Sequence, residues 1–283
     1  MSDRGIFYIA TGDQFVAEAE RSAQSVRNAL PEVPIAIATD VEPDFEFDHV
    51  IEIDDPDYSF TDQIANLHLS PFDRTLHLDT DIYMDVSAGE LFDVLDRFDI
   101  AVAHNHNRSA YDPPGVPNSF PEYNTGVVVY NNNDVIRAFT ESWDKVYDQL
   151  YDGSNPQNQP SFRKALYESN LRIATLPPEY NLMLRYPGHA IGEVKLFHGR
   201  LLDIDTPGAG KYTDVEKAAE KINASTTHRV FTQLGGITIH SNNTSNSINR
   251  IRMGIWRHGI IGACRRGISK ISIALQSLLE FAR

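Results

Sequence analysis

Four short apolar runs, separated by polar or helical segments, constrain the fold of this 283-residue chain more than any other feature. They occupy residues 5–11, 33–40, 48–54 and 75–78, with the sequences GIFYIAT, VPIAIATD, DHVIEID and TLHL. Nearly continuous apolar strands that alternate with helices are typical of a parallel sheet covered on both faces. The sequence therefore predicts a parallel α/β architecture.

The segments between and after these runs fit that architecture. Residues 13–30 place apolar side chains at helical spacing, and helices are also predicted over 62–69, 88–98, 134–152 and 158–169. Further strands are predicted over 99–104, 123–131 and 193–200. Residues 105–122 are rich in proline and polar side chains, and a loop of this length is commonly functional.

Charge and cysteine content restrict the class of protein. The net charge of -14 argues against a nucleic-acid partner, because phosphate binding requires a basic face. The single cysteine excludes an intrachain disulfide, and the first residues lack a signal-peptide pattern, so we expect a cytoplasmic protein. An acidic, lysine-poor surface suits concentrated salt, which suggests a halophilic source.

The last 36 residues have the opposite charge. Residues 248–283 carry seven Lys and Arg but one Glu, whereas residues 1–247 carry 18 basic and 38 acidic side chains. We expect a main domain over 1–247 and a basic amphipathic helical tail over 248–283. A basic amphipathic helix with Trp256 is typical of an interfacial membrane anchor, so a peripheral position on the cytoplasmic membrane face is one hypothesis. Packing of the tail on the acidic body is the alternative.

Two aspartates follow the fourth apolar run, in the sequence TLHLDTD. In a strand, residues two apart point to the same side, so Asp79 and Asp81 could meet one ligand at the strand's carboxyl end. Mg²⁺ and Mn²⁺ favour such oxygen ligands and often bridge carboxylates to phosphates. A pair of solvated aspartates that begins a turn is the simpler alternative.

A set of motifs resembles the GT-A fold glycosyltransferases related to family 8 and glycogenin. These motifs are SPFDRTLHLDTD, ELFDVLDRFDIAVAH, FPEYNTGVVVYN, LRIATLPPEYN and LFHGR, in that order within residues 5–200. The resemblance implies an open, mixed but mainly parallel sheet flanked by helices. It also implies a metal-dependent glycosyltransferase that moves a sugar from a nucleotide-diphosphate donor to a hydroxyl of a glycan or lipid-linked acceptor.

The resemblance assigns roles to individual residues. It implies that Asp79, Asp81 and His198 bind Mn²⁺ or Mg²⁺, and that Thr80 belongs to the same donor-binding turn. A histidine hydrogen-bonded at a strand end is the alternative for His198, and His240 is a competing ligand.

The resemblance also places the first strand-to-helix loop, Thr11, Gly12 and Asp13, at the nucleotide, although Asp13 would equally suit a helix N-cap. Asn124 and Gly126 suit sugar hydroxyls and close approach of a ligand, or a turn with a bulge.

Two positions depart from the resembling enzymes. Gln63 stands where a basic residue often precedes the aspartate motif, and Asn158-Gln159 stands where Asp-Gln is common. We assign Asn124, Asn158 and Gln159 to the catalytic position, yet an amide cannot act as a carboxylate nucleophile.

Other function classes remain as alternatives. A non-catalytic protein that binds sugar nucleotides or a membrane surface would accommodate Gln63 and Asn158. A sugar-nucleotide pyrophosphorylase would need a basic, glycine-rich first loop, which ATGDQF lacks. A phosphatase with an Asp-x-Asp nucleophile would place the pair on an early strand followed by Gly-Thr.

Overall fold

The computed structural model describes residues 3–107, 111–151, 157–202, 214–224, 226 and 228–231. The tail predicted over 248–283, the domain boundary at 247 and His240 lie outside these residues. Among the helices in the described part of the chain, none is long and apolar enough to cross a membrane.

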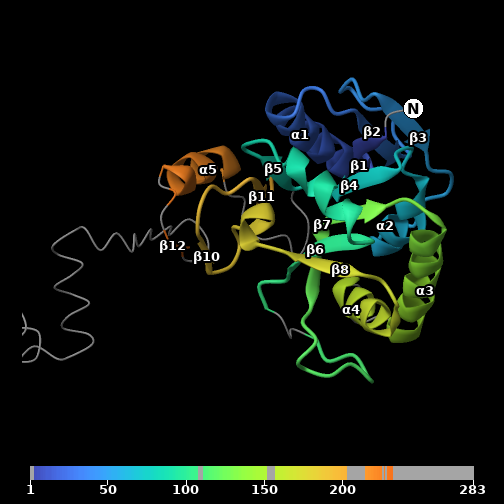
Figure 1. The fold of residues 1–283 in the computed structure, drawn as a ribbon. Coiled ribbons are helices and arrows are strands. Elements are labelled where there is room, and N and C mark those ends of the chain that lie inside the picture. The colour runs from blue at the N-terminus through green and yellow to red at the C-terminus, as the bar shows by residue number, and fades with distance from the viewer. Residues whose placement is uncertain are drawn as a thin grey trace, which may run out of the picture.

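A seven-stranded sheet forms the centre of the molecule, in the order β3-β2-β1-β4-β7-β6-β8 (Figure 1). Only β7 runs against its neighbours β4 and β6, so the sheet is mixed but mainly parallel, as predicted. Its strands are β1 (Arg4–Ile9), β2 (Ile35–Thr39), β3 (His49–Glu52), β4 (Arg74–Leu78), β6 (Ile100–His104), β7 (Tyr123–Asn131) and β8 (Ile173–Leu176).

Helices cover both faces of this sheet. The helix α1 (Asp13–Ala29) and the 3-10 helix η2 (Gly89–Asp96) share one core with it. On the other face lie α2 (Phe60–Asn66), α3 (Asp134–Leu150) and α4 (Gln159–Glu168). Alternation along β1 decides which side chain enters which core: Ile6 and Tyr8 face α1, whereas Phe7 joins a cluster on the opposite face. The fold is thus a three-layer α/β arrangement.

Two small sheets extend the body. One has the order β5-β11-β9, from Ile82–Met84, Leu196–His198 and Leu182–Met183. The other pairs β10 (Gly188–Ala190) with β12 (Arg229–Phe231). The helix α5 (Val215–Asn223) shares an apolar cluster with the segment that carries β9 to β11. Two further 3-10 turns are η1 (Leu67–Leu69) and η3 (Pro178–Tyr180). Because β5 follows the aspartate motif and pairs with β11, this small sheet brings His198 to the aspartates.

A fully buried arginine holds the described part of the 105–122 loop. Arg163 of α4 donates to the carbonyl oxygens of Tyr111, Pro117 and Phe120 at 2.7, 3.1 and 2.9 Å. One guanidinium therefore replaces the regular hydrogen bonding that this loop lacks.

We expect Arg163→Met to lower the free energy of unfolding by about 2 kcal/mol, because it removes three hydrogen bonds, although the Pro117 carbonyl still accepts from the Phe120 amide. Urea denaturation measures the change, and hydrogen exchange over 111–120 should rise with it. Lys164→Met is the matched control: Lys164 is less buried and donates to one loop carbonyl, that of Pro114. Equal effects of the two substitutions would contradict the role of Arg163.

Candidate metal and donor site

Three chain segments meet at one edge of the main sheet. The parallel strands β1 and β4 both end there, and the antiparallel strand β7 begins there. This topology places the loop after β1, the aspartate motif after β4 and the sequence Asn124-Thr125-Gly126 side by side. Carboxyl ends of strands in open α/β sheets are the usual position for ligands.

The two aspartates follow the end of β4, as predicted, but they lie in a turn, so the strand geometry used to predict their common direction does not apply. Strand β4 ends at Leu78, and residues 79–81 form the connection to β5. The Asp79 amide donates to the Gly126 carbonyl at 2.9 Å, and the Gly199 amide donates to the Asp81 carbonyl at 2.9 Å. The turn, rather than strand pleating, directs both carboxylates to the same place, because neighbouring strands hold its backbone at each end.

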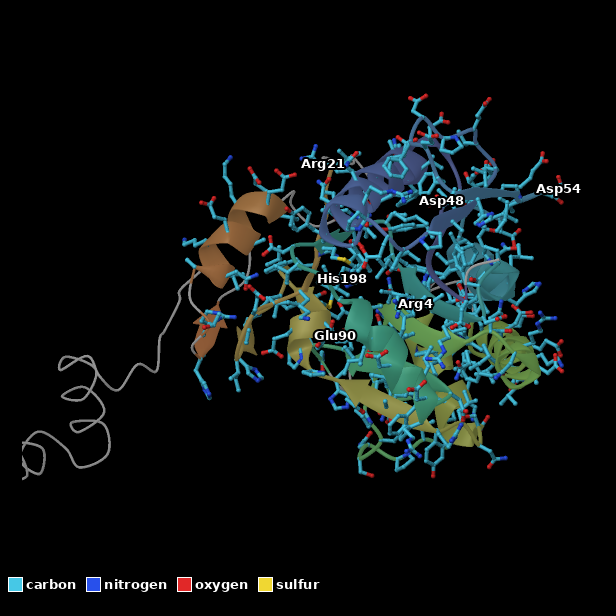
Figure 2. The ribbon with its side chains drawn as sticks, turned by 45° about the horizontal axis from the view of Figure 1, so that its top comes forward. Arg4, Arg21, Asp48, Asp54, Glu90 and His198 are labelled. Atoms are coloured by element: carbon cyan, nitrogen blue, oxygen red, sulfur yellow. The ribbon has the colours of Figure 1, made fainter. Side chains whose placement is uncertain are left out.

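Asp79, Asp81 and His198 form a group that could hold a metal ion. One ligand atom from each lies within 4.8 Å of the others. His198 Nε2 is 3.2 Å from Asp81 Oδ1. His198 is buried, and Figure 2 shows it near the centre of the view, whereas Asp54 projects at the rim. Two carboxylates and one imidazole suit Mn²⁺ well, so these residues fit the predicted cation.

A chain of amides fixes the ring of His198. Its Nδ1 lies 2.9 Å from Asn181 Oδ1, and Asn181 Nδ2 donates to Asn124 Oδ1 at 2.7 Å. Asn124 Oδ1 also accepts the Gly126 amide at 2.9 Å. Asn181 thus accepts from Nδ1–H, which leaves Nε2 as the ring nitrogen that faces Asp81 and the cation position. In the described structure Asn124, which was predicted to be catalytic, therefore supports His198 through Asn181.

The electrostatics of the group keep Asp81 ionised and favour a protonated His198, so a cation bound here would displace the proton on His198 Nε2. Burial alone would raise the pKa of the Asp81 carboxyl, but His198, Arg200 and Arg185 outweigh burial and lower that pKa well below its usual value. Burial acts to lower the pKa of His198, and Asp81 outweighs it, so the imidazole pKa is raised. An ionised carboxylate is therefore retained in a buried position beside positive charge.

The two sequence departures contact each other. Asn158 Nδ2 donates to Gln63 Oε1 at 2.5 Å, and Gln63 Nε2 donates to Asp79 Oδ1 at 2.9 Å. Asn158 is buried, and its Oδ1 accepts from the hydroxyl of Thr125 at 3.2 Å. Gln63 Nε2 is also 2.8 Å from the ring of His77. The amide pair orients the Asp79 carboxylate with a neutral donor, so the negative charge of Asp79 stays available.

We expect Asn158→Asp to lower the free energy of unfolding by about 2 kcal/mol. The new carboxylate would face Gln63 Oε1, and neither oxygen has a proton to share. Thermal or urea unfolding measures the change. Asn28→Asp is the control, because Asn28 is exposed and its side chain uses its oxygen to accept from Gln24. An unchanged unfolding midpoint for Asn158→Asp would contradict the amide contact.

Two aspartates, Asp40 and Asp62, hold the loop after β1 through hydrogen bonds. Thr11 donates to Asp62 Oδ2 at 2.8 Å, and the Gly12 amide donates to Asp40 Oδ1 at 2.8 Å. Gly12 has φ 82° and is itself the N-cap of α1. Asp13 is therefore the first residue of the helix rather than its cap, and its side chain is exposed. This leaves Asp13 available to a ligand, and the positive φ explains the glycine.

Tyr58 is an exposed ring beside this loop that the sequence reasoning missed. Its hydroxyl donates to Asp40 Oδ2 at 3.0 Å, and its ring is near the position that a Cβ on Gly12 would occupy. Nothing in the local sequence signals this contact, because Asp40 and Tyr58 are 18 positions apart.

Thr80 and Gln159, two of the predicted site residues, do not contact the Asp79, Asp81 and His198 group through the hydrogen bonds of their side chains that the structure describes. The Thr80 hydroxyl donates to Glu18 Oε2 at 2.9 Å, so this side chain is turned toward α1 and not toward the cation position. Gln159 begins α4 and is partly buried.

Two positively charged residues that the sequence did not point to, Arg185 and Arg200, are close enough to Asp81 to lower its pKa. The described site therefore has positive charge, although Gln63 does not supply it.

Comparisons with known proteins identify the fold. No protein-family model and no curated protein matches the chain. Among solved structures, the galactosyltransferase LgtC in complex with donor and acceptor sugar analogs matches with a TM-score of 0.55 and 15% identity, over 85% of this chain and 99% of LgtC. The glycosyltransferase GlyE of Streptococcus pneumoniae TIGR4 matches with a TM-score of 0.55 and 13% identity, over 78% of this chain. The match spans 61% of GlyE. The chain has the GT-A fold, which it shares with these glycosyltransferases, as the sequence motifs predicted.

Proposed function

We propose that this protein is a metal-dependent glycosyltransferase that moves a sugar from a nucleotide-diphosphate donor to an acceptor hydroxyl. The observation that carries the proposal is the convergence of Asp79, Asp81 and His198 at the carboxyl edge of the sheet. Fold alone would not support it, because one fold hosts many activities. LgtC, which shares the fold, was solved with donor and acceptor sugar analogs, which supports the substrate class.

The proposed donor site contains negatively charged side chains for a metal ion and positively charged side chains near the expected diphosphate. Asp79, Asp81 and His198 would hold Mn²⁺ or Mg²⁺, which when bound neutralises the diphosphate and stabilises it as leaving group. Arg185 and Arg200 add fixed positive charge near Asp81. The loop of Thr11, Gly12 and Asp13 lies at the same sheet edge, in position for the nucleoside. These groups bind and orient the donor.

The position of Asn158 affects the chemistry on the sugar. Its amide group is occupied by Gln63 and Thr125, and it carries no nucleophilic oxygen. We therefore assign the rate enhancement of this chain to charge neutralisation and orientation of the donor rather than to a covalent carboxylate intermediate at residue 158.

Release of nucleoside diphosphate tests the proposal. The full chain is incubated with uridine, guanosine and thymidine diphosphate hexoses, with Mn²⁺, over low and molar KCl to cover a halophilic source. We expect release from at least one donor and none in EDTA. Donor binding without turnover, with any acceptor offered, would support a non-catalytic sugar-nucleotide binding protein. Absence of both would overturn the proposal.

A membrane-associated or lipid-linked acceptor is the second part of the proposal. It rests on the basic sequence 248–283, which lies outside the described residues. Basic residues near an anionic surface each add about 1 kcal/mol of attraction at ordinary salt. We expect the full chain to float with anionic vesicles, and Arg265→Gln/Arg266→Gln/Lys270→Gln to float less. Flotation of neither chain would contradict membrane association, and equal flotation of both would reject these basic residues as its cause.

A further inference from the structure

A buried carboxylate outside the metal group connects the parts of the site. Glu18 lies in the second turn of α1, and its side chain is fully buried. It accepts hydrogen bonds from Thr80 Oγ1 at 2.9 Å, from Arg200 Nη1 at 2.6 Å and from the Leu201 amide at 3.0 Å. Thr80 separates the two aspartates, and Arg200 and Leu201 follow His198 closely. One carboxylate therefore binds both segments that supply ligands.

A carboxylate at this position is unexpected from packing alone. The other buried residues of α1 are small or apolar, namely Val16, Ala19, Ser22, Ala23, Ser25 and Val26. Burial raises the pKa of Glu18, and the Asp81 charge raises it further, whereas Arg200 lowers it. An apolar side chain would fill the space without the desolvation penalty. The carboxylate thus has a role other than filling the core.

Arg200 lies between two carboxylates. Its Nη1 is 2.6 Å from Glu18 Oε2, while its Nε is 4.0 Å from Asp81 Oδ2. That Nε is buried and makes no hydrogen bond to the residues that the structure describes. A guanidinium pairs strongly with a carboxylate through two parallel bonds, so without Glu18 the nearest strong partner of Arg200 is Asp81. Such a pair would occupy the oxygens that a cation needs.

We propose that Glu18 is a positioning residue for the cation. It fixes the aspartate turn to the segment after His198, and it holds Arg200 away from Asp81 so that Asp81 remains free to bind a divalent ion. This inference rests on the proposed metal site. It concerns only how Asp81 is kept free of Arg200, so the role of Glu18 can be disproved while the metal site is confirmed.

The test measures Mn²⁺ alone on the full chain, with free Mn²⁺ counted by electron paramagnetic resonance. We expect Glu18→Gln to weaken Mn²⁺ binding about tenfold or more, in the range typical of groups that orient metal ligands. Adding Arg200→Gln to Glu18→Gln should restore part of the affinity, because the competing cation is removed. Glu20→Gln is the matched control, since Glu20 is on the same helix but accepts from the amides of Asp44 and Phe45.

Each outcome is decisive. A purely structural role would leave the double variant as weak as Glu18→Gln or weaker, and this would overturn the proposal. Equal affinity of wild type and Glu18→Gln would overturn it as well, with the metal site intact. No Mn²⁺ binding by wild type would overturn both the metal site and this inference. If Glu18→Gln does not fold, Thr80→Val removes the contact through which Glu18 fixes the aspartate turn, and an affinity equal to wild type would then reject that part of the proposal.

Discussion

Replacing Asp81 by Asn is expected to weaken Mn²⁺ binding by about 100-fold or more and to abolish donor turnover. Groups that merely orient metal ligands are worth about 10- to 100-fold in affinity, so loss of a ligand carboxylate should reach at least the upper value. Asn keeps the shape of the side chain but supplies a neutral oxygen. It also leaves His198 and Arg200 without the charge that now faces them at 3.2 and 4.0 Å.

Titration with Mn²⁺ and assay of nucleoside diphosphate release measure these two effects. Asp93→Asn is the control, because it removes the same charge from an exposed position on η2. Circular dichroism should show both variants folded. Turnover by Asp81→Asn at the wild-type rate, with the same Mn²⁺ dependence, would remove Asp81 from the metal site.

Replacing Gly126 by Ala is expected to have the second-largest effect. A Cβ on Gly126 would lie 2.5 Å from His198 Cε1 and 2.9 Å from Asp79 Oδ2. Neither side chain can move freely, because Asn181 holds His198 and Gln63 holds Asp79. We expect the free energy of unfolding to fall by about 2–3 kcal/mol through overpacking. We also expect Mn²⁺ affinity to fall by at least about tenfold, because two ligands are displaced.

Gly199→Ala is the matched control for this prediction. Gly199 is next to His198 in sequence, but a Cβ there would meet only Leu184, at 3.5 Å or more. Urea denaturation and Mn²⁺ titration should therefore separate the two glycines. The account would be contradicted if Gly126→Ala matched wild type in both measurements. The sequence reasoning explained Gly126 by approach of a ligand, whereas the described structure explains it by approach of His198 and Asp79.

Local sequence was sufficient for most of the architecture. The strand β2 is fully buried and reads as IAIAT, so its apolar content and β-branched residues signal a central strand. The helix α1 carries its apolar side chains at regular helical spacing. The direction of β7, in contrast, has no local signal. Its residues are as buried as those of the parallel strands, and its antiparallel pairing with β4 depends on the chain path through the 105–122 loop.

Local sequence was less informative about the site. Asp79, Asp81 and His198 could be named as candidates through the resemblance of the ordered motifs to known glycosyltransferases, whereas their local pattern alone left solvated or hydrogen-bonded side chains as the simpler alternative. Their supporting groups could not be named from local pattern. Glu18 contacts a residue 182 positions away, and Asn158 contacts one 95 positions away. Such contacts depend on tertiary packing, which cannot be predicted from helical or strand periodicity.

The most direct test of the account is the position of the metal in a crystal of the full chain grown with Mn²⁺ and the nucleoside diphosphate that the donor assay selects. The account predicts an anomalous scattering peak coordinated by Asp79, Asp81 and His198 Nε2, with the diphosphate completing the shell near Arg185 and Arg200. A diphosphate bound with no metal peak among these three residues, or a metal peak coordinated elsewhere, would contradict it.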